Sequence, residues 1–220
     1  MTRSFRDRHE GGQELAALLM EYADNPAVVV LGLPRGGVPV AYEVARALRA
    51  RLDVLVVRKI GLPSQPELAM GAVASGGVRV LNNEVVDMLQ VPQVVIDSVA
   101  AHELREVERR QRAYRGEAPF PDLNGRIVII VDDGLATGST MRAAVRALRQ
   151  LRAAKIVVAA PVAALETVRS LQAEADEVVC VSAPQFFQAV SLWYEEFSQT
   201  SDEEVRSLLE SAASHTASSR

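Results

Sequence analysis

The strongest constraint on the fold is a repeated alternation between short apolar runs and segments whose apolar residues recur at helical spacing. The short runs have the valine content of buried strands and occupy residues 27–33, 53–57, 126–131, 156–160 and 177–181. Helical stripes separate them, such as the one that begins with Val38, Ala41 and Val44. This alternation predicts an α/β fold with right-handed crossovers and a mainly parallel sheet.

The expected arrangement is a doubly wound sheet in the order 2-1-3-4-5, counted along the chain from the run at 27–33. In that order the direction of winding reverses between the strands that end at Leu33 and Val131. Sheets of this kind bind ligands outside the carboxyl ends of the strands at the reversal. Gly-rich breaks follow both of these strands, so we expect the functional site at this crevice.

The spacing of these elements predicts one domain over residues 1–210, with a core at about 26–182. Between 60 and 83, glycine and proline interrupt short apolar pieces, and we expect a loop followed by a hairpin that turns at Gly76 and Gly77. The small and polar residues of 211–220 predict a disordered tail.

Composition excludes several classes of protein. With 24 basic and 28 acidic side chains, the net charge of −4 argues against a general polyanion binder, so no nucleic-acid partner is expected. The apolar runs fall far short of the ~20 residues of a bilayer helix, and no apolar segment follows the charged start, so neither a membrane partner nor an export signal is expected. The single cysteine, Cys180, fits a reducing compartment, and we expect a cytoplasmic protein.

The segment from Val128 to Thr140 is the most informative part of the chain. An apolar strand delivers Asp132 and Asp133 to its end, where like charges repel unless a cation or several donors meet them. Residues 137–140 then open a helix, whose free amides and positive dipole end suit a phosphate. An acid pair next to a phosphate cradle matches a ribose 5-phosphate, with hydroxyls on one side and phosphate on the other.

Other phosphate and hydrolase motifs do not fit this chain. Gly138 is followed by Ser139 where a Walker A loop requires lysine, and the sequence contains neither a GxGxxG fingerprint nor a GxSxG elbow. The plain alternative is an acid pair that caps a turn before an ordinary helix. It explains an isolated Asp-Asp-Gly better than it explains the whole string.

The string resembles the signature of type I phosphoribosyltransferases, in which an apolar strand and two acids precede a Thr-Gly-x-Thr phosphate loop. Leu33-Pro34-Arg35-Gly36-Gly37 resembles the pyrophosphate loop of that family, and Arg58-Lys59 stands where members often carry basic pyrophosphate ligands. Residues 58–77 also resemble a group of bacterial phosphoribosyltransferases with an unassigned acceptor.

The resemblance implies an enzyme that moves the ribose 5-phosphate group of phosphoribosyl pyrophosphate (PRPP) onto a nitrogenous base and releases pyrophosphate. It implies that Asp132 and Asp133 hold the ribose hydroxyls. The residues implied for the 5-phosphate form the loop itself: Ala136, Thr137, Gly138, Ser139 and Thr140. Mg²⁺ is the implied cofactor, held mainly through PRPP rather than by protein ligands.

The same resemblance assigns the pyrophosphate to Arg35, Gly36, Gly37, Arg58 and Lys59. Arg35 and Lys59 join the acid pair as the expected catalytic residues. Members of the family often carry a non-proline cis peptide in the pyrophosphate loop, so we expect one between Pro34 and Arg35.

In the family a small hood of terminal segments and a hairpin holds the acceptor base. Here the hood would come from the N-terminal segment, 60–83 and 184–210, and the acceptor pocket from Phe186, Phe187 and Trp193. The plain alternative is that these aromatic rings pack onto the core.

Three questions stay open at the level of sequence. A PRPP-binding sensor of the same fold, without turnover, is the alternative to an enzyme. Residues 60–71 are placed either as a closing lid or as an ordinary hairpin connection. Neither the acceptor base nor the oligomeric state, a homodimer included, follows from the sequence.

Overall fold

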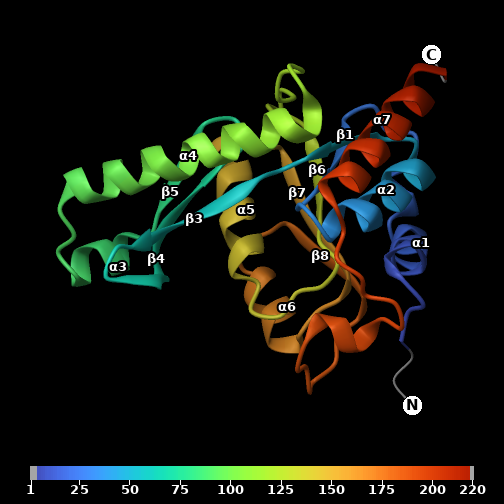
Figure 1. Cartoon of the computed structure of the whole chain (residues 1–220). Helices are drawn as coiled ribbons and strands as arrows, with labels where there is room; N and C mark the ends of the chain where they lie inside the picture. The colour runs from blue at the N-terminus through green and yellow to red at the C-terminus, as the bar shows by residue number, and fades with distance from the viewer. Residues whose placement is uncertain (1–3, 219–220) are drawn as a thin grey trace.

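The computed structural model describes residues 4–218, and its centre is a parallel sheet of five strands in the order β2-β1-β6-β7-β8 (Figure 1). The strands are β1 (Val28–Gly32), β2 (Arg51–Val54), β6 (Ile127–Val131), β7 (Lys155–Val162) and β8 (Glu177–Ser182). This order confirms the expected doubly wound arrangement and puts β1 beside β6 at the reversal.

Helices cover both faces of this sheet, which explains why its strands are apolar throughout. Successive residues of β1 point to opposite faces: Val28 and Val30 pack towards one helix layer, and Val29 and Leu31 pack towards the other. The first layer holds α1 (Arg8–Leu18) and α2 (Gly37–Leu48), and the second holds α5 (Ser139–Gln150) and α6 (Leu165–Leu171).

A small antiparallel sheet projects to one side of the core (Figure 1). It consists of β3 (Val57–Leu62), β4 (Gln65–Ala74) and β5 (Val78–Leu81), and α3 (Asn83–Met88) leads from it to the long α4 (Gln93–Arg115). α4 crosses one face of the sheet and buries Ile60 and Met70 beneath Ile96 and Val107. The hairpin turn at Gly76 and Gly77 is confirmed.

The loop expected from residue 60 is wrong, because most of 60–71 belongs to the paired strands β3 and β4. Only a short turn separates Leu62 from its partner Gln65. Irregular pairing around Gly61 interrupts the alternation, and this break hid the strand from sequence analysis. The burial of Ile60 against α4 nevertheless holds the strand in place.

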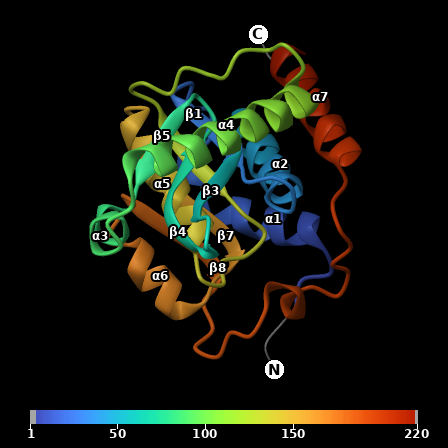
Figure 2. The ribbon, with the colours of Figure 1, turned by 60° about the vertical axis from the view of Figure 1, so that its left-hand side comes forward.

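The predicted tail is also wrong for residues 211–218, which continue α7 (Asp202–Ser218), while 219–220 lie outside the described residues. Alanine and serine permit a helix, and packing decides the outcome. Val205 is fully buried, and Leu209 and Ala212 pack against the core cluster of α1 and α2. Figure 2 shows α7 running alongside α2 and α4.

The segments expected to form one hood are only partly brought together: Val205, within 184–210, shares a buried cluster with Ile60 and Met70 of the hairpin sheet. The hairpin sheet packs against α4 and α5. The start of the chain instead pairs with the segment that contains the short helix η2 (Val190–Trp193), and the Phe5 N–H donates to the Trp193 carbonyl at 2.8 Å. These contacts do not gather all three segments around one space, and a single hood over the site stays a prediction.

We expect backbone amides of α7 to exchange slowly with deuterium as far as Ala212, because their carbonyl partners belong to a packed helix. Hydrogen exchange followed by mass spectrometry of the peptide over 205–214 measures this. Exchange there at the rate of an unstructured chain would restore the prediction of a disordered tail.

Candidate functional site

The two Gly-rich loops meet at the carboxyl ends of β1 and β6. Gly32 is paired with Val131, and the next residue, Leu33, donates its N–H to the Val131 carbonyl at 2.9 Å. A Cβ atom on Gly37 would lie 2.7 Å from that same carbonyl oxygen, and one on Gly36 would collide with the Asp133 carboxylate. Only glycine allows the loop to approach the acid pair this closely.

The acid pair is held in a desolvated position. Asp132 accepts the Asp133 N–H at 2.9 Å through Oδ1, and Asp133 Oδ2 accepts from Arg8 Nε at 2.9 Å. Burial raises the pKa of Asp132 well above its ordinary value, and the charge of Asp133 raises it further. Burial also raises the pKa of Asp133, although the Arg8 guanidinium opposes this. The pair is therefore poised to accept a cation or hydroxyl donors.

The phosphate loop is open to solvent at the start of α5. Ala136, Thr137 and Thr140 are exposed, so no side chain seals the helix N-terminus. The loop is fixed from below, since the Thr167 hydroxyl donates to the Ala136 carbonyl and Arg142 donates to the Thr137 carbonyl at 3.1 Å. These two bonds engage loop carbonyls and use none of the loop amides, which are the groups that a phosphate would bind.

A cavity of about 350 Å³ adjoins the acid pair and is lined by Arg8, Arg35, Gly36 and Asp133, among others. The Arg35 side chain is about one-third exposed, and its Nη1 lies 3.9 Å from Asp202 Oδ1. The expected cis peptide between Pro34 and Arg35 is present. Arg35 thus brings positive charge to the cavity beside the acid pair.

Arg58 and Lys59 lie on opposite faces of β3, because neighbouring residues of a strand point to opposite sides. Arg58 shares the face of Ile60, turns towards α4 and donates to Glu103 Oε2 at 2.7 Å. Lys59 is exposed on the opposite face. The structure therefore separates the two predicted pyrophosphate ligands and gives Arg58 a carboxylate partner of its own.

The aromatic residues predicted for the acceptor pocket differ in burial. Trp193 is buried in a cluster with Phe5 and Val162, and Phe187 stacks on it with ring centroids 6.3 Å apart. The plain alternative of core packing therefore holds for Trp193. Phe186 differs, because 90% of its surface is exposed.

Sequence analysis missed Arg8, the first residue of α1. Besides Asp133, its guanidinium donates to the Ser198 carbonyl at 2.7 Å and lies 3.9 Å from the centre of the Phe197 ring. One local signal was available. Asp7 and Glu10 have the spacing of a helix-capping pair, and the Asp7 side chain does accept the Glu10 N–H at 2.8 Å. The pair marks a helix start, yet it does not reveal that Arg8 reaches the acid pair.

An acid pair and an open phosphate loop, faced by a glycine loop at the reversal of a doubly wound sheet, are typical of one class of protein. The chain belongs to the phosphoribosyl transferase domain family, whose model matches residues 5–195. No helix within residues 4–218 has the length and apolar character needed to cross a membrane.

Particular relatives support this assignment. Two Mycobacterium tuberculosis proteins, from strains CDC 1551 and H37Rv, carry provisional phosphoribosyl transferase names and are 50% identical over 209 residues. That match covers 94% of this chain but 47% of theirs, so the chain spans about half the length of these relatives. The crystal structure of TT1426 from Thermus thermophilus is 44% identical, with a TM-score of 0.84 over 94% of this chain and 97% of that chain.

We expect Asp132→Asn to stabilise the protein in the absence of ligands. Because the folded-state pKa of Asp132 is raised, its ionisation costs folding free energy, and stability falls as pH rises through that pKa. The Asn variant escapes this loss, so it should unfold at a higher temperature than the wild type at neutral pH, and the difference should shrink towards pH 4.

Thermal unfolding of both proteins across pH 4–9 measures the effect, with the exposed Asp87→Asn as the matched control. Equal stability of wild type and Asp132→Asn at every pH would contradict a strained acid pair.

Proposed function

We propose that this protein is a PRPP-dependent phosphoribosyltransferase that transfers the ribose 5-phosphate group to a nitrogenous base with release of pyrophosphate. The observation that carries the proposal is the convergence of three features on one crevice: the desolvated acid pair, the open loop at the start of α5, and the glycine loop after β1. Each matches one part of PRPP.

In this proposal the ribose hydroxyls lie over Asp132 and Asp133 and donate to their carboxylates, which now accept from the Asp133 N–H and from Arg8. The 5-phosphate would bind the loop from Ala136 to Thr140, through backbone amides and the positive end of α5. The pyrophosphate would extend towards Gly36 and Gly37, where Arg35 supplies positive charge.

The donor set suits Mg²⁺ that takes most of its oxygen ligands from PRPP. Among residues 4–218 no group of three or more aspartate, glutamate, histidine or cysteine side chains could hold a metal ion. Asp132 and Asp133 supply carboxylate oxygens, and a bound cation would relieve the repulsion that raises the Asp132 pKa. When bound, Mg²⁺ would neutralise charge on the departing pyrophosphate.

The protein residues would act mainly by position and charge. As pyrophosphate leaves, positive charge develops on the ribose ring, as in glycoside chemistry. Ionised Asp132 and Asp133 beneath the ring would stabilise that charge, and the glycine-loop amides would hold the leaving group. Residues 60–71 would have to move as the β3–β4 strand pair if they close over the site.

Arg8 joins the proposed pyrophosphate ligands in place of Arg58. It lines the same cavity as Arg35 and Gly36, whereas Arg58 is bonded to Glu103 on α4. A cytoplasmic location is part of the proposal. It is supported by the single cysteine, because one cysteine forms no disulfide within the chain and such chains suit a reducing compartment.

Incubation with Mg²⁺, PRPP and a panel of nitrogenous bases should release pyrophosphate with one base. Asp132→Asn should weaken PRPP binding at least tenfold, because it removes a charged hydrogen-bond acceptor, and Asp87→Asn should leave it unchanged. Titration calorimetry gives the affinity. Tight PRPP binding without release under any base would favour the sensor, and unchanged affinity of Asp132→Asn would contradict the site.

Arg8→Gln should raise the Kd for PRPP about tenfold, the value of one charge-assisted hydrogen bond, whereas Arg58→Gln should change it less than twofold. The same calorimetry compares the two variants, and circular dichroism checks that both are folded. A larger effect from Arg58→Gln than from Arg8→Gln would contradict this proposal and favour Arg58 as the pyrophosphate ligand beside Arg35.

A further inference from the structure

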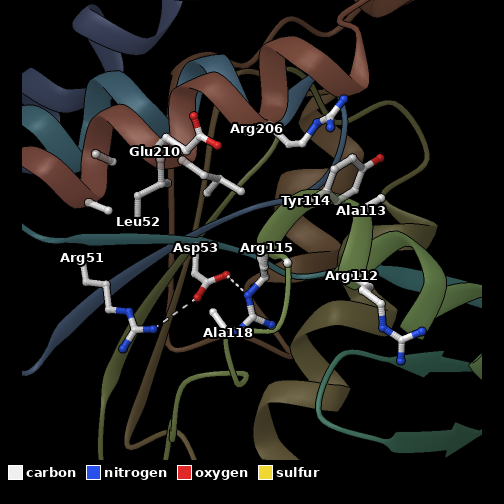
Figure 3. Close-up of a pocket in the computed structure, with 14 residues that line it drawn as sticks. Arg51, Leu52, Asp53, Arg112, Ala113, Tyr114, Arg115, Ala118, Arg206 and Glu210 are labelled. Atoms are coloured by element: carbon white, nitrogen blue, oxygen red, sulfur yellow. Dashed lines mark hydrogen bonds and ion pairs between the residues drawn. The ribbon is translucent and has the colours of Figure 1, made fainter.

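A larger cavity, of about 660 Å³, lies between β2, the end of α4 and α7 (Figure 3). None of its lining residues belongs to the proposed PRPP site. Its charged residues are four arginines and two carboxylates: Arg51, Arg112, Arg115, Arg206, Asp53 and Glu210. The cavity is therefore locally basic in a chain whose net charge is −4.

A buried ion pair forms one wall of this cavity and fixes its shape. Arg115 Nε lies 2.9 Å from Asp53 Oδ1, and both side chains are less than one-tenth exposed. Arg115 also donates to the Pro119 carbonyl and lies 5.4 Å from the Phe120 ring centre. These contacts hold Arg115 rigidly, so the wall does not need to rearrange for a ligand to enter.

The other three arginines retain donors for a ligand. Arg51 lies 3.4 Å from Asp53, Arg112 lies 3.7 Å from Glu117, and Arg206 lies 2.9 Å from Glu203. A guanidinium has five N–H donors, and one carboxylate contact leaves most of them able to bind an anion. Figure 3 shows Arg51, Arg112 and Arg206 on different sides of the hollow.

The rest of the lining is apolar, with Leu52, Leu209 and several alanines. This combination suits a ligand that has an anionic group and an apolar body, and the volume is typical of small-molecule sites. Guanidinium groups bind phosphate through paired hydrogen bonds, and a phosphate joined to an apolar body would meet both parts of the lining. We propose that the cavity binds a small phosphate monoester with an apolar body, such as an aryl phosphate.

A chain of contacts links this cavity to the pyrophosphate loop. Tyr114 lines the cavity, and its hydroxyl donates to Asp202 Oδ1 at 3.0 Å. Asp202 begins α7 and lies 3.9 Å from Arg35, and α7 also carries Arg206. A ligand that draws Arg206 towards α4 would move α7 and displace Asp202. The displacement would change the ion pair between Asp202 and Arg35. The ligand therefore changes PRPP affinity, a statement that rests on the function proposed above.

The binding test uses phenyl phosphate, which has a phosphate on an apolar ring and no ribose. Titration of the full chain, followed by amide NMR, should shift the signals of Ala113 and Gly116, which line the cavity. The double variant Arg112→Gln/Arg206→Gln changes two exposed side chains and should weaken this binding at least tenfold. Arg105→Gln, an exposed arginine of α4 outside the cavity, is the matched control and should leave it unchanged.

Three outcomes would overturn the site. They are shifts confined to the amides of 137–140, equal affinity in the double variant and the wild type, and inorganic phosphate that binds as tightly as phenyl phosphate. For the link, saturating phenyl phosphate should change the Kd for PRPP at least twofold, and Asp202→Asn should abolish that change while it keeps phenyl phosphate binding. An unchanged Kd would overturn the link.

Absence of any PRPP binding would count against the proposed function. The NMR titration would still show whether the cavity binds phenyl phosphate.

Discussion

Two adjacent carboxylates in a desolvated crevice are the constraint on which the candidate site depends. Asp132 and Asp133 stand at the end of the central strand β6, and burial raises the pKa of both. An arrangement of this kind costs folding free energy unless a cation or donors compensate it. The ion pair with Arg8 meets this requirement, because it brings positive charge to Asp133, and Gly36 leaves room for the Asp133 carboxylate.

The compensation comes from distant parts of the chain. Arg8 begins the first helix, yet its guanidinium is held at Asp133 by the Ser198 carbonyl and the Phe197 ring. The pairing of Phe5 with Tyr194 brings these two segments together. Two segments far apart in the sequence thus meet beside the acid pair.

α7 connects the cavity beside the acid pair with the basic cavity. Its first residue, Asp202, faces Tyr114 and Arg35, and its later turns line the basic cavity beside β2. One helix therefore contacts both Arg35 in the glycine loop and the proposed phosphate monoester site. Its packing against α2 and α4 gives a small movement at one end a direct route to the other.

The sequence by itself determined the sheet order, the hairpin turn, the acid pair and the phosphate loop. These features are local: periodicity sets the burial of each strand, and glycine and aspartate positions set the loops that follow. Tertiary structure alone decided that Arg8 reaches Asp133 while Arg58 pairs with Glu103, that Trp193 packs inside, and that α7 continues through residues 211–218. Each of these depends on which face a side chain occupies and which distant residue meets it there, and neither spacing nor composition encodes such long-range contacts.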